Sequence, residues 1–113
     1  NNPYKGEIHF FWSICKPIID GNDVFIAATK VESFGHGFIE KSEGVVVKSD
    51  NILTELSAEK LNWQMLPKGD IGLRPHEGQI SSEHNLVSLS DGSLYCVARN
   101  LCGLVNYYIS RDR

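Results

Sequence analysis

A turn signal in the C-terminal half of the sequence places the tightest constraint on the fold. Two apolar runs, 86–89 and 94–98, flank the dipeptide Asp91-Gly92. Asp-Gly between such runs is the strongest short-range signal for a β-hairpin, because both turn positions tolerate a positive φ. We therefore predict two antiparallel strands joined by a two-residue turn.

The same turn predicts which side chains lie at the open end of the hairpin. If Asp91 and Gly92 are the turn residues, His84 lies opposite Arg99, and Glu83 lies beside them at one rim. A carboxylate, an imidazole and a guanidinium held on rigid strands are suited to binding or catalysis. The alternative is a solvated strand end, where charged side chains are common.

Length, charge and cysteine usage limit the classes of function. The 113 residues leave room for one domain, and the net charge of -3 gives no basic surface of the kind that nucleic acid requires. No apolar run approaches the roughly 18 residues of a membrane span. The three cysteines are an odd number at wide spacings, and the four histidines lack ligand-like spacing. The sequence therefore predicts no disulfide framework, no metal site and no cofactor.

A search for repeats organises the rest of the chain. Apolar runs predict strands over 9–14, 24–29, 43–50 and 61–66, and only 53–60 has a helical character. One order of features occurs twice: a turn, two apolar strands, and then Ser-Asp or Ser-x-Asp. Asp20-Gly21 corresponds to Asp91-Gly92, and Ser49-Asp50 corresponds to Ser110-Arg111-Asp112. The first copy spans about 5–66, and the second, 79–113, lacks a fourth strand.

Repeated units of four short antiparallel strands are typical of β-propeller blades, which stack because one blade cannot bury both of its faces. We therefore predict an all-β fold in which residues 1–113 form one partial propeller unit. The second blade is expected to be incomplete. The alternative is a small β-sandwich of about seven strands.

Several motifs resemble one family of propellers. Ser110-Arg111-Asp112 follows an aromatic strand and resembles the start of an Asp-box, the Ser-x-Asp-x-Gly-x-Thr-Trp turn of sialidase-like propellers. Ser49-Asp50, with Trp63 after an insertion, resembles a degenerate copy. The stretch from Glu83 to Arg99 resembles the sialidase blade in which a glutamate opens the innermost strand and an arginine ends the next. Residues 42–55 are also similar to bacterial sialidase-like, or BNR-repeat, proteins. The chain thus resembles about two blades of a six-bladed ring.

The resemblance implies a function and roles for two residues. In sialidases the matching glutamate activates a tyrosine nucleophile, and the matching arginine helps to clamp the substrate carboxylate. By position, Glu83 would be the base and Arg99 the clamp, for which a guanidinium is well suited. The chain would then be part of a glycoside hydrolase acting on terminal, acidic sugars, secreted or periplasmic, and inactive by itself. The alternative is a non-catalytic propeller that binds a glycan or a protein.

Three further residues are candidates for substrate binding. They are His84, Arg74, which lies in a Gly-rich connection, and His36, which lies between two glycines. Glycine permits a close approach of the backbone to a ligand, although a plain polar loop residue is the alternative for each. The expected partners are a carbohydrate and either the rest of the propeller or a second copy of the chain.

Overall fold

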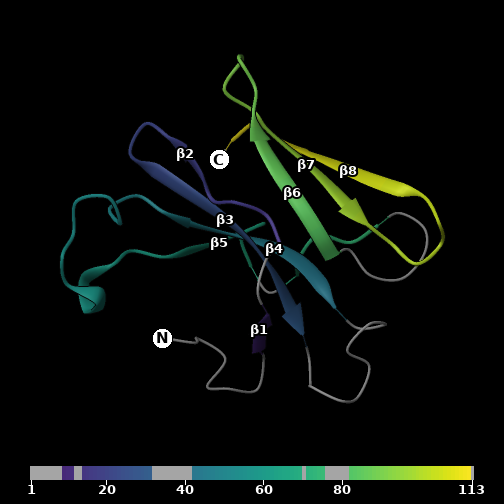
Figure 1. Ribbon diagram of the computed structural model, residues 1–113, viewed down its shortest axis with the longest axis horizontal. Helices are drawn as coiled ribbons and strands as arrows, with labels where there is room; N and C mark the ends of the chain where they lie inside the picture. Colours follow the sequence, from purple (N-terminus) through teal and green to yellow (C-terminus); the bar gives the residue numbers. More distant parts are fainter. Residues whose placement is uncertain (1–8, 12–13, 32–41, 70, 76–81, 113) are drawn as a thin grey trace.

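The computed structural model describes residues 9–11, 14–31, 42–69, 71–75 and 82–112, and these residues form two antiparallel sheets (Figure 1). The predicted all-β class is confirmed. Apart from a single 3₁₀ turn, η1 (Ala58–Lys60), the described residues contain no helix. None of their helical segments is long and apolar enough to cross a membrane.

The first sheet has the strand order β1-β3-β4-β5, with β2 also paired to β3. Its strands are β1 (His9–Phe11), β2 (Ile18–Asp20), β3 (Asp23–Val31), β4 (Glu43–Ser49) and β5 (Gln64–Leu66). β1 and β2 pair with opposite halves of β3. Pro17 immediately precedes β2, and it has no N–H to donate to the hydrogen bonds between strands. The strands predicted over 24–29, 43–50 and 61–66 are therefore confirmed, the last shortened to three residues.

The second sheet is a three-stranded meander in the order β6-β7-β8. Its strands are β6 (Ser82–Ser88), β7 (Leu94–Arg99) and β8 (Val105–Ser110). The two sheets share one core, in which Phe25, Ala27 and Val46 of the first contact side chains of the second. The second sheet contributes Leu86, Leu94 and Cys96. Burial of this apolar surface holds the two sheets together.

The loop between β6 and β7 differs from the predicted two-residue turn. The Leu89 N–H donates to the Ser93 carbonyl oxygen at 2.9 Å, and the Gly92 N–H donates to the Leu89 carbonyl oxygen at 3.0 Å. Three residues, 90–92, therefore form the loop, with Gly92 in the left-handed region at φ +85°. This is the three-residue hairpin that ends in a glycine, and Asp-Gly fits it as well as the tighter turn.

The extra loop residue shifts the register of the hairpin by one position. Leu86, and not Val87, lies opposite Cys96. Because side chains alternate between the faces of a strand, a shift of one residue exchanges the faces. Leu86 and Cys96 therefore point together into the core, and Val87 points away from it.

The turn after β4 depends on Asn51, which the sequence had not singled out. Its Oδ1 accepts hydrogen bonds from the Asn62 N–H at 2.9 Å and from the Ser49 hydroxyl at 3.4 Å. Its Nδ2 donates to the Lys60 carbonyl oxygen at 3.0 Å. Ser110 and Asp112 form a similar contact after β8, at 3.2 Å. In both places the serine at the end of the strand donates to the side chain two positions later, and after β4 that side chain, Asn51, also binds the backbone of the turn.

Candidate functional site

The charged residues predicted from the sequence lie where four strands begin or end on one side of the molecule. β3 and β7 end there and β4 and β6 begin there, as their arrowheads and tails show in Figure 1. Lys30 pairs with Glu43 across β3 and β4, and Ser82 pairs with Arg99 across β6 and β7. We call the charged side chains at these strand ends the rim: Lys30, Glu43, Arg74, Glu83 and Arg99.

Glu83 and Arg99 are brought together as expected. The Arg99 Nη1–H donates to Glu83 Oε2 at 2.9 Å, and both side chains are about half exposed. The ladder between β6 and β7 is interrupted between Ser82 and Asn85, so Glu83 occupies a bulge. A bulge re-aims the side chain that it carries, which here lies against the guanidinium.

The backbone of Glu83 is strained. Its φ is +48°, and it is the one non-glycine residue with a positive φ among those that the structure describes. A residue with a Cβ pays about 1–2 kcal/mol to adopt this conformation. Such strain is concentrated at functional sites, where the surrounding structure enforces it.

His84 does not lie at the rim, so its predicted place beside Glu83 and Arg99 is wrong. It points to the opposite face of β6 and is 2% exposed, between the two sheets. Its Nε2–H donates to the Val45 carbonyl oxygen at 2.8 Å. Burial lowers the pKa of His84, and the hydrogen bond to Val45 only partly offsets this effect. The register shift and the bulge explain the difference, because each moves side chains between faces.

Arg74 is paired with Glu43, a residue that the sequence did not indicate. Both Nε and Nη2 of Arg74 contact Glu43 Oε1. The Gly72 N–H donates to Oε2 at 2.8 Å, and Lys30 Nζ lies 3.7 Å from the same oxygen. Burial by itself would raise the pKa of Glu43, but the hydrogen bonds and the two positive charges outweigh it and lower the pKa. Glu43 therefore remains ionised and fixes Arg74 at the rim.

The remaining predicted residue, His36, lies outside the described residues, so its position relative to the rim stays a prediction. No sequence signal connects Glu43 with Arg74, since 31 positions separate them. The isolated bridge between Gly44 and Leu73 brings the two segments together. Gly72 is required there, because a Cβ would lie 2.6 Å from the Gly44 carbonyl oxygen.

A shallow hollow of about 410 Å³ lies beside the Glu83–Arg99 pair. Its lining is mainly apolar and includes both members of the ion pair. Residues that line it include Glu83, Asn85, Val97, Arg99, Leu104 and Val105. An apolar floor with a few polar groups at the side is suited to a small polar ligand with one apolar face.

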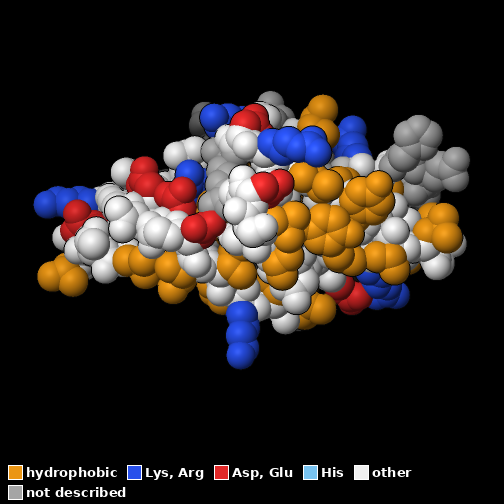
Figure 2. Space-filling model, turned by 90° about the horizontal axis from the view of Figure 1, so that it is seen from above, with side chains coloured by type: hydrophobic (Ala, Val, Ile, Leu, Met, Phe, Trp, Pro, Cys, Tyr) orange, Lys and Arg blue, Asp and Glu red, His pale blue; other side chains and the backbone are white. Residues whose placement is uncertain are grey.

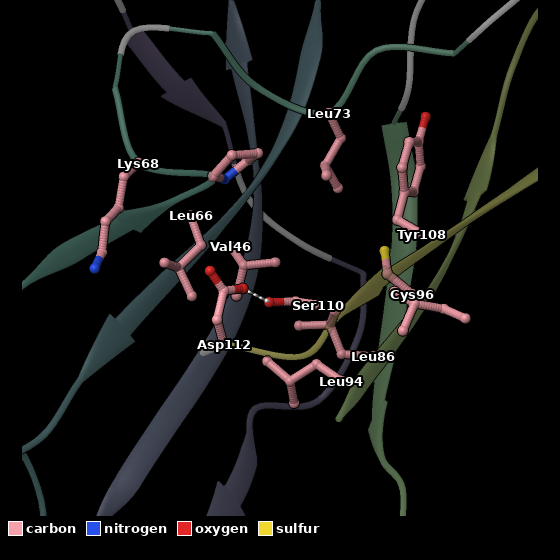
Figure 3. Close-up of a pocket in the computed structure, with 12 residues that line it drawn as sticks. Val46, Leu66, Lys68, Leu73, Leu86, Leu94, Cys96, Tyr108, Ser110 and Asp112 are labelled. Carbon is pink, nitrogen blue, oxygen red and sulfur yellow. Dashed lines mark hydrogen bonds between the residues drawn. The ribbon is translucent and has the colours of Figure 1, made fainter. Parts of the chain in front are cut away.

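A second cavity of about 380 Å³ lies between the two sheets, where β5 and β8 diverge (Figure 3). Leu66 and Val46 face Leu86, Cys96 and Tyr108 across it, and Ser110 hydrogen-bonds Asp112 at one side. None of the predicted site residues lines this cavity. It is an extension of the apolar core and carries little polar chemistry.

The described residues contain no cluster of metal ligands, and the Cys96 thiol is buried. No three His, Cys, Asp or Glu side chains of these residues gather as metal ligands. Cys96 belongs to the core, and Cys15 packs against it. Burial, with a smaller effect of Cys15, raises the pKa of the Cys96 thiol to about 12, so this thiol stays protonated and unreactive.

Comparisons of the chain with protein-family models, with curated proteins and with solved structures find no match.

Proposed function

We propose that the chain is part of a sialidase-like β-propeller whose rim binds a terminal, acidic sugar, and that the complete protein is an exo-acting glycoside hydrolase. The observation that carries this proposal is Glu83. It is strained, placed in a bulge and in contact with Arg99 at the start of β6. A solvated strand end needs neither the strain nor the bulge.

The chemistry of Arg99 supports an anionic ligand. A guanidinium has five N–H donors in a planar fork, and the 2.9 Å contact with Glu83 uses Nη1. The guanidinium is more than half exposed, so it can bind a carboxylate in two-point geometry while Glu83 orients it. Arg74 adds a second fixed positive charge to the rim.

The role of Glu83 in hydrolysis follows the resemblance to sialidases. These enzymes use a tyrosine nucleophile, which needs a neighbouring base to remove its proton. Glu83 would be that base, and the tyrosine would come from elsewhere in the complete protein. The described residues alone are therefore expected to bind sugar and not to cleave it.

A non-catalytic propeller that binds a glycan or a protein is the second candidate. The surroundings of Glu43 favour this non-catalytic candidate. Its carboxylate contacts the Gly72 N–H, Arg74 and Lys30, and its pKa is lowered. This carboxylate is therefore a counter-ion and a poor proton donor. Both candidates predict binding at the rim, and they differ in turnover.

The binding test compares two arginines in the full-length gene product. Arg99→Ala should weaken binding of sialyl-lactose by about 10- to 100-fold, because one charge-assisted hydrogen-bond pair contributes about 1.5–3 kcal/mol. Arg111→Ala removes the same charge after β8, at the other end of the sheet, and should leave binding unchanged. Lactose, which lacks the carboxylate, should bind weakly to all three proteins. Equal binding of the two sugars by wild type would refute an acidic ligand.

The turnover test uses Glu83→Gln, which keeps the size and hydrogen-bonding capacity of the side chain. If the complete protein releases sialic acid from sialyl-lactose, this variant should lose at least about 100-fold in kcat, the lower end of the range for general-base catalysis. Undiminished turnover would exclude a catalytic role for Glu83. Saturable binding with no release of sugar by wild type would select the non-catalytic candidate.

A further inference from the structure

Three side chains of the second sheet each bury a nitrogen atom that has no hydrogen-bond partner among the described residues. The three atoms are His84 Nδ1, Asn100 Nδ2 and Asn106 Nδ2. In the described part of the chain, no other buried side-chain nitrogen or oxygen lacks a partner. Buried polar atoms are almost always hydrogen-bonded, so each of these three requires an explanation.

The three side chains share the inner face of the sheet. Buried positions alternate along β7, and the pattern continues from Ala98 to Asn100. Asn106 lies on the same face of β8 as Tyr108, which packs against the core. His84 lies on the inner face of β6, between the two sheets. The outer surface is different, because Figure 2 shows hydrophobic side chains gathered on the right-hand half of the molecule, where Figure 1 places β7 and β8.

The strand registers bring the three side chains around Ala98. Asn106 pairs with Ala98 across β7 and β8. His84 lies in the bulge of β6, which faces Ala98 from the other side. Asn100 is the next residue of the chain after Ala98 that points inward. Neighbouring strands are only about 4.8 Å apart, and Ala98 itself carries no more than a methyl group. One small molecule above this methyl group is therefore within reach of all three nitrogen atoms.

The pattern of donors and acceptors defines the molecule that fits. The Cys102 N–H donates to Asn100 Oδ1 at 3.1 Å, which fixes the amide and leaves its Nδ2 as a donor. Asn106 Nδ2 is a second donor. His84 Nδ1 is an acceptor, because the proton of the ring lies on Nε2 and is donated to the Val45 carbonyl oxygen. Two donors and one acceptor are complemented by an oxygen atom with two lone pairs and an O–H group.

A water molecule has this pattern and the necessary size. A sugar hydroxyl has the same chemistry, but neither of the two hollows described above is lined by His84 or Asn106. A cation does not fit, because the two amide nitrogens are donors. We propose that the second sheet binds one internal water molecule, which accepts hydrogen bonds from Asn100 Nδ2 and Asn106 Nδ2 and donates one to His84 Nδ1. Three hydrogen bonds are the usual number for a buried water.

This water joins the three strands of the sheet at the end that carries the rim. His84 directly follows Glu83 in the chain, and Asn100 directly follows Arg99. The water therefore holds the two strand ends that carry the ion pair, from the opposite face of the sheet. The proposal concerns the support of this pair and is independent of the ligand that binds at the rim.

A high-resolution crystal structure of the full-length gene product tests the water directly. The expected result is one isolated peak of electron density at about 2.7–3.2 Å from each of the three nitrogen atoms. A protein atom in place of the peak would overturn the proposal. Density with no peak at this position would overturn it as well.

The variant Asn106→Leu tests the same site through the direction of a stability change. Leucine keeps the approximate volume of asparagine and removes the donor. If Nδ2 donates to the water, the ratio of unfolded to folded protein at a fixed urea concentration should rise by about tenfold. If Nδ2 is unpaired, its removal should leave stability equal or higher, and this result would refute the proposal.

The matched control is Asn22→Leu, which makes the same chemical change in the exposed turn between β2 and β3. It should change the ratio of unfolded to folded protein by no more than about twofold. The crystallographic test uses the wild-type protein, so it decides the proposal even if Asn106→Leu does not fold. Neither measurement involves sugar binding, so failure of this proposal is distinguishable from failure of the proposed function.

Discussion

The His84 ring donates a hydrogen bond from Nε2 to the Val45 carbonyl oxygen, 2.8 Å away and 39 positions earlier in the chain. A carbonyl oxygen only accepts, so the proton of the neutral ring is on Nε2 and Nδ1 is an acceptor. Nδ1 has no hydrogen-bond partner among the described residues. This contact joins the first strand of the second sheet to the centre of the first sheet.

Loss of the His84 side chain should separate the sheets locally. His84→Ala removes a fully buried ring and leaves the Val45 carbonyl oxygen without its donor, which should lower the free energy of unfolding by about 2–4 kcal/mol. Urea denaturation followed by fluorescence measures the change. Leu56→Ala, at a fully exposed position, should change stability by less than about 0.5 kcal/mol. Equal stability of the two variants would contradict a structural role for His84.

The low pKa of His84 predicts a loss of stability in mild acid. Burial depresses the pKa in the folded state below its ordinary value of 6.5, so the unfolded state binds the proton more readily. Stability should therefore be full above pH 6.5 and decrease as the pH falls below it. His84→Gln cannot titrate, so its stability should change less between pH 7 and pH 5. Parallel pH profiles of wild type and His84→Gln would show that other groups cause the loss.

The strain at Glu83 predicts an unusual order of stabilities. Both Glu83→Gly and Glu83→Ala lose the ion pair with Arg99, but glycine adopts a positive φ without the steric penalty, whereas alanine keeps it. Glu83→Gly should therefore be more stable than Glu83→Ala by about 1 kcal/mol. Thermal unfolding of the two variants measures the difference. If Glu83→Ala is the more stable, the bulge relaxes readily and the strain carries no functional meaning.

The turn between β4 and β5 should depend on the Asn51 amide. Asn51→Ala removes the acceptor for the Asn62 N–H and the donor to the Lys60 carbonyl oxygen, at a cost of about 1–3 kcal/mol. Asn51→Asp keeps the acceptor, so it should recover part of this loss. Hydrogen exchange at the Asn62 amide should be faster in Asn51→Ala and near wild type in Asn51→Asp. Unchanged exchange in Asn51→Ala would mean that water replaces the side chain.

Local patterns were sufficient to predict most strands. β-branched runs such as that of β4 indicate strands through their own conformational preferences, and Pro17 and the Gly-containing turns mark their limits. The contact between Glu83 and Arg99 was also predictable. Both residues lie at the open end of a single hairpin, and this hairpin spans only 17 residues of sequence. The size of the loop was not, since Asp91-Gly92 is compatible with a two-residue or a three-residue turn.

The sequence by itself determined the all-β class, most of the strands and the presence of a charged pair at the open end of the hairpin. The tertiary structure decided which face each residue of β6 uses, because the core selects the register that buries Leu86 with Cys96. It also decided that His84 joins the sheets and that Glu43 holds Arg74. These contacts span 39 and 31 positions, and no local preference encodes a partner so far along the chain.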